Sequence, residues 1–256
     1  MPIDVIEKLK GRDSLTPPRS MISFALGGRD FKRKGEEFKN YFLGLVQLKK
    51  NDRVLDVGCG IGRMAVPLTS YLSQKGEYWG FDTTRKSIKW CNKYIAARFG
   101  NFHFQHIDIY NKVYNPKGKC FAKHLQFPYQ SDYFDFVFLI SVFTQMLLED
   151  VENYMSEISR VMKPHSRCFI TYFLLNNESE NLIHEGASAV DFKYKLNKGL
   201  TINESEPERS IAYDEDFVRG LYVKYGLRII EPIHYGYWCG RETFLSYQDI
   251  VVATKG

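Results

Sequence analysis

Residues 54–63, VLDVGCGIGR, constrain the fold more than any other stretch of the chain. An apolar run ends in Asp56, and glycines then follow at every second position, at Gly58, Gly60 and Gly62. A glycine-rich turn between a strand and a helix lets the backbone approach a ligand with no Cβ in the way. We therefore expect a short buried strand, then a ligand-binding turn, and then a helix.

Strand-like and helix-like segments alternate along the chain. Strands are expected at residues 53–57, 77–81, 102–107, 134–140, 168–174, 227–233 and 248–254. Helices are expected at residues 31–45, from the glycine turn to about 72, at 85–98, 149–162 and 214–225. Pro67 should disturb the helix after the turn, Pro164 should end the fourth helix, and Asp214 should cap the last. Strands separated by helices predict an α/β fold with a doubly wound, mostly parallel, seven-stranded sheet.

The composition is that of an ordinary soluble globular protein: of 256 residues, 44% are hydrophobic and 25% are charged, and the net charge is +5. No stretch approaches the roughly 18 apolar residues of a membrane span, and the N-terminus carries no signal-peptide core. The five cysteines are odd in number and form no CxxC pair, which favours free thiols in a reducing compartment. His103 and His106 should point to opposite faces of a strand. We expect a cytoplasmic protein without a metal site or a membrane contact.

Two classes of cofactor use such a turn, and the glycine spacing separates them. A dinucleotide site needs G-x-G-x-x-G/A, but here its third glycine position is Arg63. The observed D-x-G-x-G-x-G resembles the first motif of the class I S-adenosylmethionine-dependent methyltransferases. Further matches follow in order: Asp82, 26 residues after Asp56; Asp108 with Ile109; and YFDFVFLISVFTQM followed by ISRVMKP, as in small-molecule methyltransferases of type 11.

The resemblance covers roughly residues 30–175 and implies a Rossmann-like methyltransferase fold that binds S-adenosyl-L-methionine and releases S-adenosyl-L-homocysteine. It implies that Asp56 contacts the cofactor's amino group and that Asp82 accepts both ribose hydroxyl hydrogens. It also implies that Asp108 meets the adenine amino group. Two structural alternatives stay open: Asp56 ties down the turn, and Asp82 caps the next helix. The expected cofactor-binding residues are Asp56, Gly58, Cys59, Gly60, Gly62, Arg63, Asp82, Thr83, Asp108, Ile109, Ser141 and Val142.

We expect one methyltransferase domain over residues 1–256, with two additions to the bare fold. Residues 1–48 are an N-terminal helical lid segment, and residues 49–175 are the cofactor-binding core. Residues 176–212 are a polar insertion at the edge of the sheet where ligands are usually covered. With few large apolar side chains, this insertion should be mobile without ligand and close over the substrate as a cap. Residues 213–256 supply the last helix and strand pair.

The chemistry asks little of the protein, because the sulfonium already carries an activated methyl group. In-line orientation and exclusion of water supply much of the acceleration. A general base helps only when the acceptor is a hydroxyl or a protonated amine. The polar residues just beyond the fourth and fifth strands are Ser141, Thr144, Gln145 and Tyr172. None is a convincing base, so the catalytic residues stay unassigned.

The sequence lacks two motifs of nucleic-acid methyltransferases, which narrows the expected class of methyl acceptor. Amino-directed nucleic-acid methyltransferases carry an Asn/Asp-Pro-Pro-aromatic stretch after the fourth strand, whereas this chain has Ile140-Ser141-Val142-Phe143. The Pro-Cys nucleophile of cytosine-carbon methylation is absent too. A small metabolite is favoured, O-methylation before N- or C-methylation, by a monomer or homodimer without a nucleic-acid partner. The alternatives are an inactive binding or scaffold protein of this fold, a nicotinamide-dependent oxidoreductase, and an RNA or protein methyltransferase.

Overall fold

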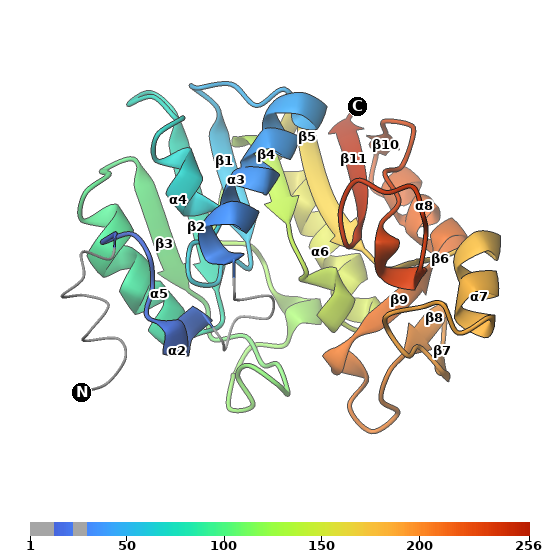
Figure 1. Cartoon of the computed structure of the whole chain (residues 1–256). Helices are drawn as coiled ribbons and strands as arrows, with labels where there is room; N and C mark the ends of the chain where they lie inside the picture. The colour runs from blue at the N-terminus through green and yellow to red at the C-terminus, as the bar shows by residue number, and fades with distance from the viewer. Residues whose placement is uncertain (1–12, 23–29) are drawn as a thin grey trace. The chain divides into compact units, whose positions relative to one another are not determined.

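The computed structural model describes residues 13–22 and 30–256, and its main sheet has seven strands (Figure 1). They are β1 (Arg53–Val57), β2 (Glu77–Asp82), β3 (Phe102–His106), β4 (Phe134–Leu139), β5 (Met162–Tyr172), β10 (Leu227–Ile229) and β11 (Asp249–Lys255). Their order is β10-β11-β5-β4-β1-β2-β3. The pairs β1–β2, β2–β3 and β4–β5 are parallel, whereas β11 is antiparallel to β5 and to β10. The predicted α/β fold with a mostly parallel seven-stranded sheet is confirmed.

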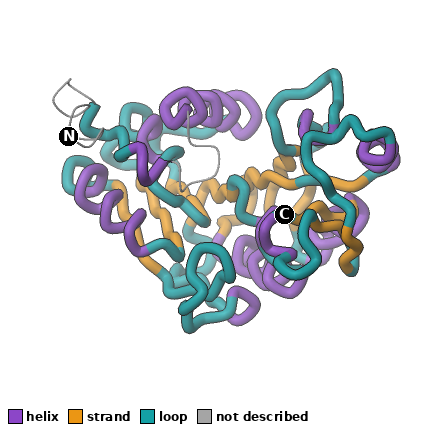
Figure 2. The backbone as a smooth tube through the Cα atoms, turned by 60° about the horizontal axis from the view of Figure 1, so that its bottom comes forward, coloured by secondary structure: helices purple, strands orange, loops and turns teal. Residues whose placement is uncertain are grey.

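The chain divides into two compact units, residues 1–107 and 108–256, and helices flank the strands in each (Figure 2). The helices in the described part of the chain are α2 (Arg19–Ile22), α3 (Phe31–Tyr41), α4 (Ala65–Leu68), α5 (Arg85–Cys91), α6 (Leu148–Val161), α7 (Asn177–His184) and α8 (Glu215–Lys224). π-Helical turns at Phe42–Val46 and Asn92–Ala96 extend α3 and α5. The predicted helix after the glycine turn is much shorter than expected, and Pro67 lies in its first turn, where proline is tolerated.

In the first unit, buried strand residues place the glycine turn. Val54, Leu55 and Val57 of β1 are fully buried, as expected for a parallel strand covered on both faces. The turn follows directly, and α3 packs closely against the segment after it. A Cβ on Gly35 would lie 2.6 Å from the carbonyl oxygen of Arg63. Glycine at position 35 is therefore required for this close contact between α3 and the chain that follows the turn.

In the second unit, the start of β5 differs from the prediction. The strand begins at Met162, directly after α6, and so includes Pro164. The helix stops at Val161, one residue before the predicted end, and Pro164 follows three residues later, as is common after a helix end. The pairing of β5 with β4 changes register between Phe134 and Phe136. Such an irregularity accommodates a proline within a strand, because the ladder hydrogen bond is already interrupted there.

One further boundary in this unit was predicted incorrectly, and one predicted cap has the right position without its hydrogen bond. β10 ends at Ile229 instead of residue 233, because Pro232 cannot donate to a strand partner. Asp214 stands at the N-cap position of α8, as predicted, but its side chain makes no capping hydrogen bond. The first turn of α8 does carry two acidic residues, Glu215 and Asp216, which favour a helix N-terminus electrostatically.

Residues 176–212, expected to have little core, pack into a substructure of their own. A second sheet has the order β6-β9-β8-β7, from Leu174–Leu175, Ile211–Asp214, Gly199–Thr201 and Tyr194–Leu196. The buried cluster that holds the segment contains Phe173, Leu175, Phe192, Ala212, Trp238 and Cys239, with Leu182, Ile183, Val190, Leu200, Ile202 and Tyr247 packed against it. The expectation of little core was wrong, because Phe173 and Trp238, from outside the segment, complete the cluster.

We expect this cluster to hold the segment without any ligand. The amides of β8 and β9 should be protected from hydrogen exchange in the ligand-free protein. Phe192→Ala should lower the free energy of unfolding by roughly 3–5 kcal/mol, since it leaves a cavity beside Phe173 and Trp238. The same change at Phe121, whose side chain is 54% exposed, should cost less than about 1 kcal/mol. Urea unfolding measures the change in stability, and hydrogen exchange measures the protection of the amides. Rapid exchange across β8 and β9 would contradict this prediction and support a mobile cap.

Candidate cofactor and acceptor site

The glycine turn after β1 has a backbone conformation that glycine adopts readily. Gly58, Gly60 and Gly62 have φ angles of 79°, 52° and 73°, in the left-handed region. A Cβ on Gly60 would meet no described atom within 4 Å, whereas a Cβ on Gly62 would lie 2.7 Å from Cδ1 of Ile95 and 3.2 Å from Sγ of Cys91. The turn is therefore open at Gly60, where a ligand can lie against the backbone, and is closed by packing at Gly62.

Asp82, at the end of β2, holds this turn through both carboxylate oxygens. Oδ2 accepts a hydrogen bond from the N–H of Gly60 at 2.8 Å, and Oδ1 accepts one from the N–H of Thr84 at 2.6 Å. The second bond is an Asx-type turn before α5. Each oxygen retains a further lone pair. The carboxylate therefore shapes the turn and can also accept ribose hydroxyl hydrogens.

Asp56 lies beneath the turn, with 3% of its surface exposed. Its Oδ2 accepts a hydrogen bond from the hydroxyl of Tyr78. Burial raises the pKa of Asp56 to about 8, although the Tyr78 hydrogen bond opposes the rise. The neighbouring Asp82 raises this pKa further, and the guanidinium of Arg63 lowers it. The carboxyl is therefore largely protonated at neutral pH, and a cation placed against it would favour the ionised form.

The remaining predicted residues of the first unit lie around the turn. Cys59 is buried against β2, since a Cβ on Gly80 would lie 2.8 Å from the Cβ of Cys59. Burial raises the pKa of the Cys59 thiol well above its usual value and lowers the pKa of Arg63. The carbonyl oxygen of Thr83 lies 3.1 Å from Nε2 of His106. The structure thus brings eight of the twelve predicted residues, from Asp56 to Thr83, to the ends of β1 and β2.

In the second unit, Asp108 and Ile109 form the start of a long loop. Oδ1 of Asp108 accepts a hydrogen bond from Nδ2 of Asn115 at 3.0 Å. Ile109 is buried and pairs with Cys120 in an isolated β-bridge. A Cβ on Gly118 would lie 2.4 Å from the carbonyl carbon of Ile109. The loop therefore folds back on this dipeptide and fixes its backbone.

Ser141 and Val142 follow the carboxyl end of β4. Ser141 has a φ of 58°, which is uncommon for a residue other than glycine. Its N–H donates to Oγ1 of Thr171 at 2.8 Å, and its Oγ donates to Oε1 of Gln248 at 2.8 Å. Strained backbone of this kind persists only where the surroundings fix it, and it clusters at functional sites. Sequence reasoning did not identify Gln248.

The other residues considered as bases are buried or hydrogen-bonded. The hydroxyl of Tyr172 is 3.1 Å from that of Tyr222, and burial raises the pKa of Tyr172 well above its usual value. Thr144 is 2% exposed. Nε2 of Gln145 donates to the hydroxyl of Tyr114 at 3.1 Å. None of these groups has the chemistry of a general base at neutral pH, in agreement with the sequence analysis.

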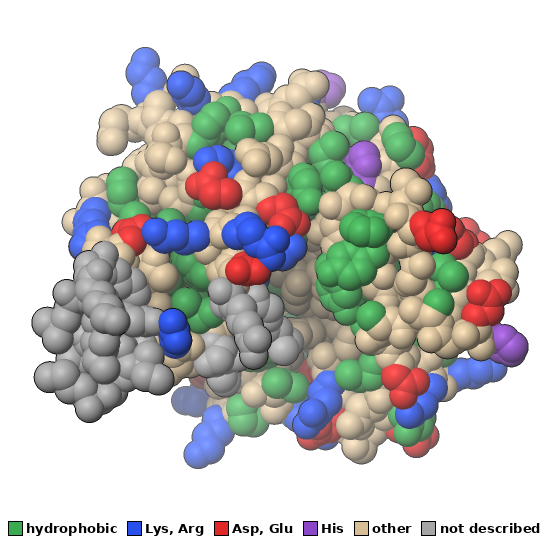
Figure 3. All heavy atoms as spheres, in the orientation of Figure 1, with side chains coloured by type: hydrophobic (Ala, Val, Ile, Leu, Met, Phe, Trp, Pro, Cys, Tyr) green, Lys and Arg blue, Asp and Glu red, His purple; other side chains and the backbone are tan. Residues whose placement is uncertain are grey.

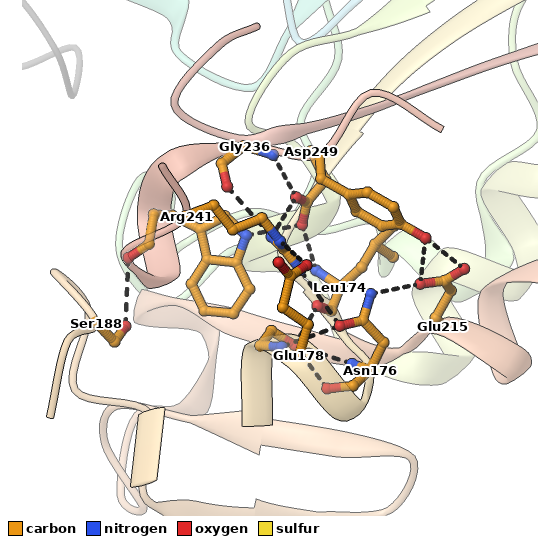
Figure 4. A network of polar contacts seen from close by, with 11 residues as sticks. Leu174, Asn176, Glu178, Ser188, Glu215, Gly236, Arg241 and Asp249 are labelled. Carbon is orange, nitrogen blue, oxygen red and sulfur yellow. Dashed lines mark hydrogen bonds and ion pairs between the residues drawn. The ribbon is translucent and has the colours of Figure 1, made fainter. Parts of the chain in front are cut away.

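A buried ion pair that the sequence analysis missed joins the last strand to α7 (Figure 4). Nη1 of Arg241 lies 3.2 Å from Oδ1 of Asp249, and the two side chains are 3% and 0% exposed. Nε of Arg241 donates to Oε2 of Glu178 on α7 at 2.7 Å, and Nη2 donates to Oδ1 of Asn176 at 3.3 Å. The only signal in the sequence was an acid directly before the apolar run IVVA.

Asp249 is the centre of this network. Its carboxylate also accepts hydrogen bonds from the N–H groups of Leu174 and Gly236, both at 2.7 Å, and from Nε1 of Trp238 at 2.8 Å. Burial raises the pKa of Asp249 to about 6, while the backbone donors, Arg241 and Trp238 lower it. Trp238 is fully buried. The network is therefore structural, and Trp238 is a core residue.

Some kinds of site are absent from the described part of the chain. No helix of residues 13–22 and 30–256 is long and apolar enough to cross a membrane, and no three His, Cys, Asp or Glu side chains are grouped to hold a metal ion. The five cysteines are free, as predicted.

The comparison with protein families supplies the class. Residues 48–213 match the family model described as "Methyltransferase domain". Because the match covers more than half of the chain, the chain belongs to this methyltransferase family. The open glycine turn with Asp82 fits S-adenosyl-L-methionine, the cofactor that the sequence resemblance implies.

One curated relative is a probable methyltransferase by name, and one solved structure shares the fold. The probable cobalt-precorrin-6B C(15)-methyltransferase (decarboxylating) of Saccharolobus solfataricus is 34% identical over 65 residues, 25% of this chain and 32% of that protein. The match thus spans about a third of that relative's length. The PH0226 protein of Pyrococcus horikoshii has a TM-score of 0.60 at 16% identity, over 91% of this chain and 94% of its own.

A further solved structure carries ligands. The 1,6-didemethyltoxoflavin-N1-methyltransferase of Burkholderia thailandensis, with 1,6-didemethyltoxoflavin and S-adenosylhomocysteine bound, has a TM-score of 0.57 at 13% identity. The similarity covers 100% of this chain and 90% of that one. At this identity the likeness establishes the shared fold.

Two glycines of the turn should respond differently to substitution. Gly60→Val should abolish S-adenosylhomocysteine binding while the protein stays folded, because the added side chain occupies the open space. Its left-handed φ should cost about 1–2 kcal/mol of stability. Gly62→Val should cost more stability, since its side chain meets Ile95 and Cys91 as well. Calorimetry measures binding and thermal unfolding measures stability. Normal cofactor binding by the Gly60 variant would contradict the assignment of the open space.

Cofactor affinity should depend on pH through Asp56. If the cofactor's ammonium lies against this carboxyl, binding must release the proton that the free protein holds up to about pH 8. Affinity should then rise about tenfold per pH unit from pH 6 towards 8 and level off above. Asp56→Asn should remove this dependence. Calorimetry in buffers of different ionisation enthalpy counts the protons released, and a count of zero in the wild type at pH 7 would exclude the contact.

Proposed function

We propose that the chain transfers the cofactor's methyl group to an oxygen atom of a small-molecule acceptor. The observation that carries this proposal is the turn after β4. Ile140-Ser141-Val142-Phe143 has no proline, and side chains of Thr171 and Gln248 hold it in a strained conformation. It differs from the Asn/Asp-Pro-Pro-aromatic stretch of amino-directed nucleic-acid enzymes. Hydroxyl and amide groups at this position suit hydrogen bonding to an oxygen-bearing metabolite.

The segment at residues 176–212 supports a small acceptor. It starts directly after β6 and packs on Phe173, the residue that follows β5. Ligands of open α/β sheets bind at the carboxyl ends of parallel strands. We therefore assign this segment as the cap that limits the size of the acceptor, fixed in place by its own core. The Burkholderia relative, whose bound acceptor is 1,6-didemethyltoxoflavin, is an enzyme of this fold with a small acceptor.

The protein's contribution to the reaction is orientation. The cofactor, when bound, supplies an activated methyl group on its sulfonium. The backbone at Gly60 and the carboxylate of Asp82 would hold it, as their geometry and hydrogen bonds allow. Tyr172 is buried with a raised pKa, so proton removal by this residue is not part of the scheme. Rate acceleration then comes from alignment and from exclusion of water, which can supply several powers of ten.

The test is release of S-adenosylhomocysteine from S-adenosylmethionine in the presence of separate acceptor sets. We expect turnover with a panel of phenols and carboxylic acids. We expect none with transfer RNA or a peptide mixture, because the turn after β4 lacks the nucleic-acid pattern. Gly60→Val is the control that binds no cofactor. Mass spectrometry of the product identifies the methylated atom. Turnover with only the RNA or the peptides would overturn the proposal.

A further inference from the structure

Gln248 occupies the edge of the sheet where acceptors are expected. It precedes β11, whose first residue, Asp249, pairs with Tyr172 at the end of β5. It is therefore at the carboxyl end of β5, beside the turn after β4, the edge at which α/β sheets bind ligands. The side chain is half-buried. Within the described residues, Nε2 of Gln248 has no hydrogen-bond partner, whereas Oε1 accepts from Ser141.

Ser141 fixes which way the carboxamide of Gln248 points. The serine hydroxyl donates to Oε1 at 2.8 Å, so the two N–H donors of the carboxamide lie on the side away from the serine. The serine itself cannot move freely, because its N–H donates to Oγ1 of the fully buried Thr171. Its left-handed φ of 58° is held by these two bonds. The result is a pair of preorganised donors at a ligand-binding edge.

Tyr247, the residue before Gln248 in the sequence, belongs to a group of aromatic side chains. The ring of Tyr247 lies 5.9 Å from that of Phe173 and 5.0 Å from that of Tyr237. The ring of Tyr237 lies 4.8 Å from that of Phe244. Tyr237 and Phe244 are 42% and 52% exposed. Figure 3 shows one face of the molecule, on which apolar side chains gather. The two directed donors of Gln248 match a molecule that carries an oxygen acceptor.

We propose that Gln248 is a specificity-determining residue, whose carboxamide donates hydrogen bonds to a carboxylate or carbonyl oxygen of the methyl acceptor. Ser141 acts through Gln248 as a positioning residue. The inference rests on the proposed function, since it names the chemistry of the acceptor of that reaction. Glutamate at this position would still accept from Ser141 but would replace both donors by an acceptor. The Gln248→Glu variant should therefore prefer a cationic ligand, whereas the wild type prefers an anionic one.

The probes are benzoate and benzylamine, which share a planar ring and differ in whether they accept or donate hydrogen bonds. Binding is measured by calorimetry with and without saturating S-adenosylhomocysteine. In Gln248→Glu we expect the benzoate Kd to rise at least about tenfold and the benzylamine Kd to fall by about the same factor. Gln130→Glu makes the same charge change at an exposed residue before β4, at the opposite end of the strand, and should leave both values unchanged.

A third variant tests the positioning role. Ser141→Ala should raise the benzoate Kd by about threefold without creating affinity for benzylamine. Equal benzoate affinity in the wild type and in Gln248→Glu would overturn the inference, and so would absence of benzoate binding to the wild type. The cofactor titration separates the two proposals: a wild type that does not bind S-adenosylhomocysteine contradicts the proposed function. Normal cofactor binding with unchanged probe preference contradicts the role of Gln248 alone.

Discussion

The carboxylate of Asp82 is the interaction on which the cofactor turn depends. A turn with three residues in the left-handed region leaves N–H groups pointing away from any regular ladder, and each needs a partner. Asp82 provides the partner for Gly60, a charge-assisted hydrogen bond on the scale of roughly 1.5–3 kcal/mol. The carbonyl of Phe81 accepts from Gly58 and Cys59. Glycine avoids the roughly 1–2 kcal/mol that a side chain would add at each such φ. The two effects together hold the turn in a conformation that is open at Gly60.

The same two effects explain why this part of the molecule was predictable. The acid, the three glycines and the second acid are fixed by local backbone geometry and by a short span between neighbouring strands. The spacing of these acids and glycines in the sequence therefore predicts the local structure, and β1, β2 and Asp82 lie where the pattern places them. The pattern could not separate the roles of the glycines. Gly62 is constrained by Ile95 and Cys91 of the following helical segment, and only the packed structure shows that contact.

The second unit was harder to predict, because its decisive contacts join residues far apart in sequence. Residues 176–212 are polar when read alone, yet Phe192 packs at 5.4 Å from the ring of Phe173 and at 5.5 Å from that of Trp238. The composition of residues 176–212 alone does not predict such a core, because Phe173 and Trp238 lie outside this segment. Likewise, Arg241 and Glu178 form an ion pair that connects the loop before β11 to α7. Gln248 was missed for the same reason, since its partner, Ser141, lies more than a hundred positions earlier.

Two buried carboxylates show how the structure separates support from binding. The carboxylate of Asp249 accepts hydrogen bonds from Arg241, two backbone N–H groups and an indole N–H. Burial still raises the pKa of Asp249 to about 6. At neutral pH Asp249 is ionised, and its carboxylate oxygens are already hydrogen-bonded within the protein. Its role is therefore structural. Asp56 has the hydroxyl of Tyr78 as its hydrogen-bond donor, and burial raises its pKa to about 8. A carboxyl with so few donors retains its proton until a cation arrives, because an unpaired buried charge costs several kcal/mol. The number of donors around each group therefore explains why Asp249 is ionised at neutral pH and holds the fold, whereas Asp56 keeps its proton.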